Sequence, residues 1–83
     1  MNYYHVYDKL IQKRRECPLD TEHQYCEEHH ILPKCIGGTD DSENLICLTA
    51  REHYIAHLLL AKAYNNYKLY YAVVKMRVSS RNH

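Results

Sequence analysis

Four histidines within residues 27–57 constrain this chain more than any other feature of its sequence. His29 and His30 are adjacent, and a turn region that contains both glycines of the chain follows them. His53 and His57 lie four residues apart in a helical pattern, which places both imidazoles on one face of a helix. What the chain can do therefore depends on whether its fold brings the first pair of imidazoles onto the second.

The length of 83 residues leaves room for one small domain, which we take to be residues 1–83. The core of such a domain is thin, and chains of this size often depend on a metal, on disulfides or on a partner. Charged residues interrupt the N-terminal segment early, and no apolar stretch reaches the length of a membrane span. These features predict a soluble, intracellular protein that makes no contact with a membrane.

Four cysteines leave three interpretations open, namely two disulfides, a structural zinc site, or reduced thiols. No two of them form the C-x-x-C pair that a cysteine-rich zinc site commonly uses. We therefore favour reduced thiols, with Cys26 and Cys47 serving as small residues of the core. The cysteines of the chain are Cys17, Cys26, Cys35 and Cys47.

The net charge is only +1, but the charges are segregated along the chain. Residues 1–15 hold four basic side chains against one acidic one, and residues 53–83 hold five basic side chains and no acidic one. Residues 16–52 hold nine carboxylates against two basic side chains. Basic flanks around an acidic, histidine-rich centre suit a protein that holds phosphates at its edges and a cation in its middle. For any single lysine, solvation of a helix face is the simpler explanation.

The hydrophobic pattern predicts a helix, two strands and a further helical region. Apolar residues near helical spacing predict a first helix over residues 2–16, which Pro18 ends. Residues 25–32 and 44–48 predict two short strands, which are antiparallel if the loop between them folds back on itself. The order of elements is therefore helix, strand, strand and helix.

The helical region after the second strand has clear start and stop signals. Thr49 and Glu52 form a capping box, in which Thr49 caps the helix and Glu52 reaches back to it. The asparagine pair at residues 65–66 predicts a break, and a last helix is expected over about residues 67–78. The residues beyond it are expected to fray, and His83 to have no role.

The first strand presents a geometric difficulty. The two-residue alternation of a strand places Glu27 and His29 on one face and His30 on the other. Both histidines can serve one site only if the strand bends or ends near His30. In the loop that follows, Gly37 and Gly38 are expected to supply backbone angles that other residues resist, and the acids to be solvated.

This arrangement of residues resembles the HNH endonucleases. Within them it is most similar to the group with a doubled first histidine, as in phage-type homing endonucleases and colicin-type DNase toxins. The resemblance covers residues 25–60 and rests on the types, order and spacing of Glu27, His29, His30, Gly37, Gly38, Asn44, Leu48, His53 and His57. It implies an α+β fold with a ββα-metal (His-Me finger) core over residues 25–64, flanked by an N-terminal and a C-terminal helix.

Carried over residue by residue, the resemblance assigns roles in a hydrolytic site. His30 becomes the general base, Asn44 the residue that orients it, and His29, His53 and His57 the ligands of one divalent metal ion. An imidazole has an unperturbed pKa of about 6.5, so at cellular pH it can accept a proton from an attacking water. Three imidazole ligands leave a cation with open positions for phosphate oxygens.

The remaining assignments concern the surroundings of the site. Glu27 resembles the family's acidic residue near the metal, and we expect it to orient a ligand imidazole or the base. Lys34, Arg51 and Lys62 are candidates for contacts with DNA phosphates. The resemblance implies hydrolysis of DNA, with Mg²⁺ or Mn²⁺ as the metal in function, although a set of imidazoles also suits Zn²⁺ or Ni²⁺.

A different class of protein stays open. A structural zinc site of three histidines and one cysteine would close the fourth position and make a DNA-binding module without chemistry, but it leaves His30 and Asn44 without roles. The sequence shows no recognisable base-reading module. A minimal nuclease, a piece of a longer enzyme and a homodimer that converts nicks into double-strand breaks therefore all stay open.

Overall fold

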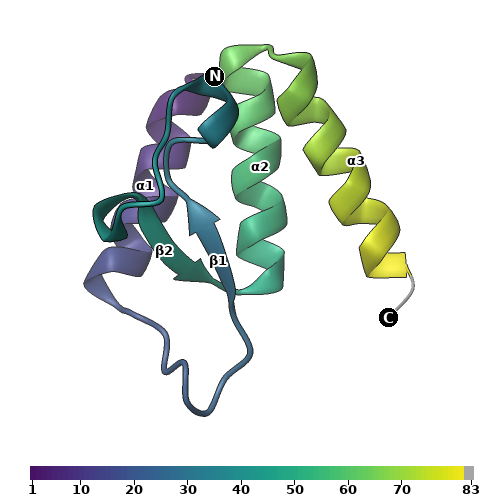
Figure 1. The fold of residues 1–83 in the computed structure, drawn as a ribbon. Coiled ribbons are helices and arrows are strands. Elements are labelled where there is room, and N and C mark those ends of the chain that lie inside the picture. The colour runs from purple at the N-terminus through teal and green to yellow at the C-terminus, as the bar shows by residue number, and fades with distance from the viewer. Residues whose placement is uncertain (82–83) are drawn as a thin grey trace.

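Within residues 1–81, a two-stranded sheet and three α-helices make up the fold, and the sheet lies against the first two helices (Figure 1). The structure is a computed structural model that describes residues 1–81, with side chains described for residues 1–77. The elements are α1 (Tyr3–Glu16), β1 (Glu27–His30), the 3-10 turns η1 (Lys34–Ile36) and η2 (Ser42–Asn44), β2 (Leu45–Leu48), α2 (Ala50–Tyr64) and α3 (Tyr67–Arg81). The predicted α+β class is confirmed.

Local hydrogen bonds explain where the helices begin and end. Oδ1 of Asn2 accepts from the backbone N–H of His5 at 3.1 Å and starts α1. The capping box is confirmed, because Thr49 Oγ1 accepts from the N–H of Glu52 at 3.1 Å and the Glu52 carboxylate accepts from the N–H of Thr49 at 3.0 Å. Asn65 ends α2 in the left-handed region with a φ of 49°, where the asparagine pair predicted the break.

β1 and β2 form an antiparallel hairpin, as predicted. The ladder pairs Glu27 with Leu48 at one end and His30 with Leu45 at the other. β1 is shorter than the predicted range 25–32. The N–H of Ile31 still donates to the backbone carbonyl of Asn44 at 2.8 Å, but the next N–H, that of Leu32, donates to the Asn44 side chain. The first strand therefore ends at the residue where the sequence required it to bend or end.

The core lies between α2 and its three neighbours, which are α1, the hairpin and α3. Leu48, Leu60 and Leu69 are fully buried, and they come from β2, α2 and α3 respectively. Tyr7 and Ile11 complete this core from α1. Burial of each of these leucines contributes about 1.5–3 kcal/mol to the stability of the fold. A core of this size makes a domain only marginally stable.

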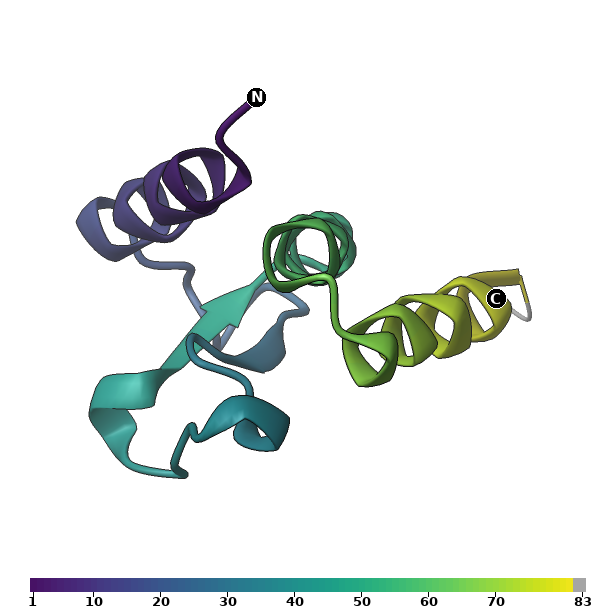
Figure 2. The same ribbon diagram turned by 90° about the horizontal axis from the view of Figure 1, so that it is seen from above.

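α3 begins beside the C-terminal end of α2 and diverges from it along its length (Figures 1 and 2). One of its faces stays uncovered, with exposed Tyr67, Tyr71 and Val74. The helix continues to Arg81, beyond the predicted end near residue 78, whereas His83 lies outside the described residues. None of the described helices has the length and apolar character needed to cross a membrane.

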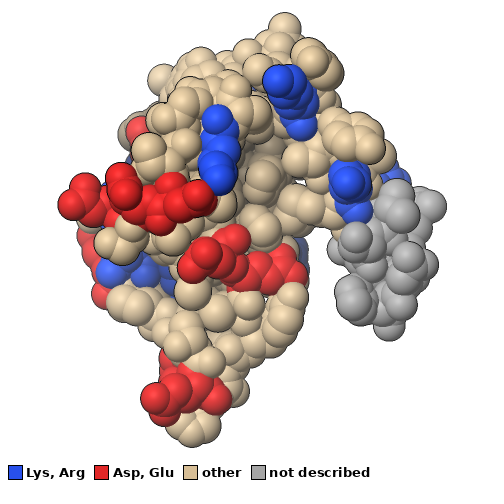
Figure 3. All heavy atoms as spheres, viewed as in Figure 1, with Lys and Arg blue, Asp and Glu red and all other residues tan. Residues whose placement is uncertain are grey.

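Charged side chains of opposite sign are partly separated on the face shown in Figure 3. Acidic side chains lie on the left, in the centre and at the bottom, whereas basic side chains lie toward the top and over α3, with one further basic patch among the acidic side chains on the left. The acidic residues 16–52 of the sequence build the hairpin region, and the basic residues that follow build α2 and α3. The segregation of charge along the sequence is thus partly retained in space.

Candidate metal centre

Three imidazoles meet where β1 packs against α2. His29 comes from β1, and His53 and His57 come from successive turns of α2. The ring centroids of His29 lie 5.1 Å from those of both helical histidines, which are themselves 4.8 Å apart. One ring nitrogen from each residue lies within 4.8 Å of those of the others. We call these three residues the histidine cluster.

Burial keeps two members of the histidine cluster neutral. The side chain of His29 is only 1% exposed. Burial, reinforced by the neighbouring imidazoles, lowers the pKa of His29 to about 3 and that of His57 to about 4. The neighbouring charge of His30 makes a smaller contribution to both shifts. At cellular pH both buried rings therefore retain a lone pair that can bind a cation.

One nitrogen of each buried ring has no hydrogen-bond partner. Tyr7 Oη lies 2.6 Å from the carbonyl oxygen of Ile31 and 2.7 Å from Nε2 of His29, which leaves Nδ1 of His29 buried without a hydrogen-bond partner. Nδ1 of His57 is buried and unpartnered in the same way. Buried unpartnered nitrogens are costly and uncommon, and a bound cation would satisfy both. The residues present therefore fit a metal ion.

Glu27 holds the third imidazole. Its Oε1 accepts a hydrogen bond of 2.8 Å from Nδ1 of His53, and its Oε2 accepts from the hydroxyl of Tyr25. Because Nδ1 of His53 is the donor, the lone pair of this ring is on Nε2. Glu27 was predicted to orient a ligand imidazole or the base, and this hydrogen bond joins it to one of the three clustered histidines.

His30 lies at the end of β1 with its side chain about one-third exposed. Its Nε2 is 2.8 Å from Oδ1 of Asp40, and Lys34 Nζ is 2.8 Å from the other oxygen of the same carboxylate. These hydrogen bonds, that of Lys34 first, lower the pKa of Asp40. As expected of the acids of this loop, Asp40 is exposed, and its carboxylate also connects His30 to Lys34.

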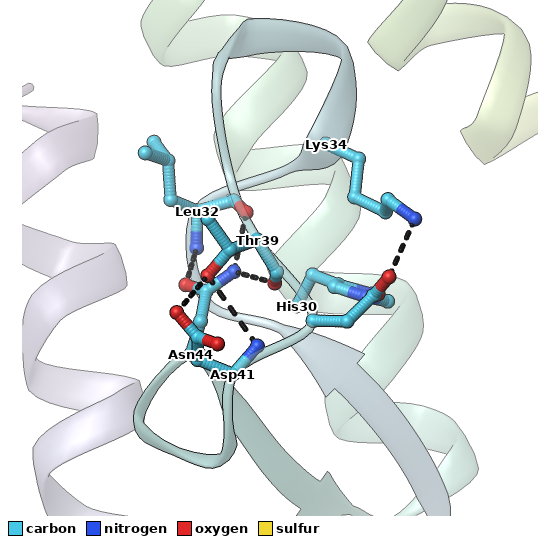
Figure 4. A network of polar contacts seen from close by, with 7 residues as sticks. His30, Leu32, Lys34, Thr39, Asp41 and Asn44 are labelled. Atoms are coloured by element: carbon cyan, nitrogen blue, oxygen red, sulfur yellow. Dashed lines mark hydrogen bonds and ion pairs between the residues drawn. The ribbon is translucent and has the colours of Figure 1, made fainter.

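Asn44 organises the loop that carries His30 into its position (Figure 4). Its Nδ2 donates to the carbonyl of Leu32 at 3.0 Å and to that of Thr39 at 2.8 Å, and its Oδ1 accepts from the N–H of Leu32 at 2.8 Å. Figure 4 shows the Asn44 side chain pointing into the loop between these groups. The amide therefore fixes the backbone immediately after the histidine pair.

The two glycines of this loop serve different purposes. Gly37 has a φ of +106°, as expected of a glycine that ends a turn. Gly38 has no positive φ; instead, an added Cβ would overlap the backbone carbonyl of Leu32 and come within 3.0 Å of Asn44 Nδ2. The prediction of a special backbone angle is confirmed for Gly37 only, and Gly38 is required because the chain passes close to Leu32.

The predicted phosphate-binding residues do not gather in one place. Lys34 pairs with Asp40 near His30, and Arg51 is exposed in the first turn of α2. Nζ of Lys62 lies 5.6 Å from the ring centroid of Tyr3, against α1. Of the three, only Lys34 has a described contact that leads to His30.

Cysteines do not join the histidine cluster in the part of the chain that the structure describes. All four are free, and a hydrogen bond with Cys26, together with partial burial, raises the pKa of the Cys47 thiol. A closed site of three histidines and one cysteine is therefore not formed by the described side chains. A second group, Asp20, Glu22 and His23, is fully exposed and lies in the loop after α1.

Two contacts of the site were not predicted from the sequence, and both come from α1. Tyr7 reaches His29, and Arg14 donates from Nε and Nη2 to the two Glu52 oxygens at 3.2 and 2.6 Å. Although burial alone would raise the pKa of Glu52, the hydrogen bonds from Arg14 and Thr49 hold it below its ordinary value. Arg14 thus ties α1 to the first turn of α2, directly before His53. The helical spacing of Tyr7 on α1 signals an inward-facing residue, but no local pattern indicates its partner.

These features define a small α+β domain with a three-imidazole cluster between a hairpin and a helix. The chain is 57% identical over 75 residues to probable mobile endonuclease D of Enterobacteria phage T4. This match covers 87% of the chain and 29% of that protein. It is 48% identical over 82 residues to probable mobile endonuclease B of the same phage, covering 96% of this chain and 31% of that protein. An uncharacterized 38.5 kDa protein in psbA intron 1 of Chlamydomonas moewusii is 40% identical over 60 residues, covering 72% of this chain and 17% of that protein.

The chain spans about a third or less of the length of these relatives. Because the alignment with endonuclease B takes in nearly the whole chain, it includes the histidine cluster. Neither a family model nor a solved structure matches the sequence. The homologues named in phage T4 are thus probable mobile endonucleases, and the HNH assignment stays a prediction.

Proposed function

We propose that the chain is the nuclease domain of a metal-dependent DNA endonuclease of the homing type, with a ββα-metal core of the HNH kind. The observation that carries the proposal is the pair of buried, unpartnered Nδ1 atoms on His29 and His57, in a cluster completed by His53. The names of the phage relatives support a nuclease that acts on DNA inside a host cell. Their greater length fits a protein in which other parts supply target recognition.

The metal ion is assigned to Nδ1 of His29, Nδ1 of His57 and Nε2 of His53. When bound, a divalent cation supplies Lewis-acid stabilisation of the charge that develops on the phosphate and on the leaving oxygen. Imidazole ligands suit Zn²⁺, Ni²⁺ or Mn²⁺, and endonuclease function on Mg²⁺ or Mn²⁺ follows from the family resemblance. Three protein ligands without a cysteine leave positions open for substrate, which favours a catalytic site over the structural zinc alternative.

His30 acts as the general base in this proposal. Its ring, at the end of β1 and next to His29 in the sequence, takes a proton from the water that attacks phosphorus. The bond to the 3′ oxygen breaks, and this oxygen takes a proton from solvent, which leaves a 3′-hydroxyl and a 5′-phosphate. The hydrogen bond to Asp40 holds the ring in place before substrate arrives. Asn44 fixes the backbone after His30, so that the ring keeps its position relative to the phosphate.

Plasmid nicking tests the proposal. The chain should nick supercoiled DNA with added Mg²⁺, Mn²⁺ or Zn²⁺ and lose the activity in chelator. His30→Ala should lose at least about 100-fold in rate, the usual contribution of a general base, while it keeps the metal affinity of the unmodified chain. His23→Ala is the matched control, because His23 is exposed and also hydrogen-bonds to an aspartate, Asp20. Undiminished nicking by His30→Ala would remove His30 from the mechanism.

A further inference from the structure

We propose that Tyr7, in α1, fixes which nitrogen of His29 carries the ring proton and thereby keeps Nδ1 of that histidine available to the metal ion. This inference rests on the metal site of the proposed function and extends that site to the N-terminal helix. Tyr7 is a positioning residue, because it contacts a ligand side chain and neither the metal ion nor the substrate.

The direction of two hydrogen bonds carries the inference. Tyr7 Oη lies 2.6 Å from the carbonyl oxygen of Ile31 and 2.7 Å from Nε2 of His29. A carbonyl oxygen can only accept, so the single hydroxyl proton goes to Ile31. The hydroxyl oxygen is then left as an acceptor, and His29 must donate to it from Nε2. In a neutral ring this places the lone pair on Nδ1, which is the atom that lacks a partner.

Burial prevents Tyr7 and His29 from exchanging these hydrogen bonds for hydrogen bonds to water. Tyr7 is 6% exposed and His29 is 1% exposed, so water has little access to compete for either group. A histidine in solution would populate both tautomers, whereas this one is held in the form that presents Nδ1 to the cluster.

The same hydroxyl also fixes the backbone around the proposed base. His29 and Ile31 are the residues on either side of His30, and Tyr7 contacts both of them. The distance along the chain is large, since Tyr7 precedes these partners by 22 and 24 residues. α1 is thus part of the site, and its role is not confined to a basic flank that holds DNA.

Tyr7→Phe is the variant that tests the inference, because it keeps the buried ring and removes only the hydroxyl. Calorimetric titration of the metal-free 83-residue chain with Zn²⁺ should show an affinity about 10- to 100-fold weaker in the variant, the range found when a residue that orients a metal ligand is removed. In ¹⁵N NMR spectra of the metal-free chain, His29 should be the Nε2–H tautomer in the unmodified protein and should gain the Nδ1–H tautomer in Tyr7→Phe.

Tyr4→Phe is the matched control, because it removes a hydroxyl from the same helix at a ring that packs edge-on against Tyr64. It should change neither the affinity nor the tautomer. An Nδ1–H tautomer in the unmodified chain, or a Tyr7→Phe variant with unchanged tautomer and affinity, would overturn the inference. If the unmodified chain binds no Zn²⁺, the proposed function fails, and the NMR spectrum still decides the role of Tyr7. If Tyr7→Phe does not fold, the tautomer of His29 in the unmodified chain still tests the inference.

Discussion

Glu27 and His53 are joined by a hydrogen bond of 2.8 Å that connects the first residue of β1 to the N-terminal part of α2. The carboxylate accepts from Nδ1, so Nε2 of His53 is left for the cluster. A carboxylate behind an imidazole ligand fixes the plane of the ring and raises its basicity. The two residues are 26 positions apart in sequence, and their contact is one of the links between hairpin and helix.

Replacing Glu27 should weaken metal binding. Glu27→Gln keeps an oxygen that can accept from His53 but removes the charge, and we expect Zn²⁺ affinity to fall by about 10-fold; Glu27→Ala should cost about 100-fold. Competition titration against a chromophoric chelator measures both values. Glu28→Ala, at the exposed neighbouring position, is the control. Equal affinities for Glu27→Ala and Glu28→Ala would show that the carboxylate does not support a ligand.

Asn44→Asp should impair cleavage with little effect on metal binding. The substituted side chain can still accept from the N–H of Leu32, but it places a carboxylate against the carbonyl oxygens of Leu32 and Thr39, where the amide of Asn44 now donates. We expect the loop after His30 to shift and the nicking rate to fall by about 100-fold, since small displacements of a base are costly.

A second asparagine offers a matched comparison for that variant. Oδ1 of Asn66 accepts from the N–H of Lys68 at 2.8 Å at the start of α3, a position where an aspartate serves equally well. Asn66→Asp should therefore keep full nicking activity. If Asn44→Asp is as active as Asn66→Asp, the loop does not position the base.

Local patterns sufficed to predict the parts of the fold that depend on neighbouring residues. The capping box at Thr49 and the break at Asn65 were predictable because each is formed by residues within one turn of a helix. The i,i+4 spacing likewise placed His53 and His57 on one face of α2, where they meet. The hairpin was predictable in type and less so in length, because Asn44 replaces part of the ladder with side-chain hydrogen bonds.

Contacts between distant elements could not be read from the sequence. Tyr7 follows an ordinary amphipathic spacing, and only the packing of α1 against the hairpin reveals that its hydroxyl reaches His29. The pairing of Arg14 with Glu52 spans 38 residues and depends on the same packing. The need for a glycine at residue 38 comes from a close approach to Leu32 that no turn pattern specifies.

That close approach gives a prediction for the two glycines. Gly38→Ala should destabilise the chain by about 1–3 kcal/mol, the range for overpacking, and should reduce nicking because the Leu32 carbonyl it displaces is bound to Asn44. Gly37→Ala meets no atom within 4 Å and is strained only by its φ of +106°, so it should cost about 1 kcal/mol. Urea unfolding measures both. A larger loss of stability in Gly37→Ala than in Gly38→Ala would contradict the steric explanation.

The metal-free chain should lose stability as the pH falls from about 6.5 to about 4. Burial holds the pKa of His29 at about 3 and that of His57 at about 4, whereas both rings titrate near 6.5 when unfolded. The unfolded state then binds more protons in this window, which costs on the order of 1 kcal/mol per pH unit for each ring. Above about pH 7 these rings are neutral in both the folded and the unfolded state, so they do not make stability depend on pH.

Urea unfolding in chelator at pH 7.5, 6 and 5 measures this loss. His57→Leu removes one of the two buried titrating groups and should show a shallower pH dependence than the unmodified chain. His23→Ala removes an exposed ring and is the control, which should follow the unmodified chain. Identical slopes for all three proteins would mean that the buried rings do not control acid stability.

Binding of duplex DNA should weaken steeply with salt, because each lysine or arginine that neutralises a phosphate releases counterions. The exposed basic residues of α3 include Lys68 and Lys75, and no acidic residue follows Glu52 in the sequence. Changing either to Gln should reduce the slope of log affinity against log salt by about 1 if it contacts a phosphate. Lys75→Arg keeps the charge and should leave the slope unchanged. Fluorescence anisotropy between about 50 and 200 mM salt measures these slopes, and a flat response would make α3 an ordinary solvated surface.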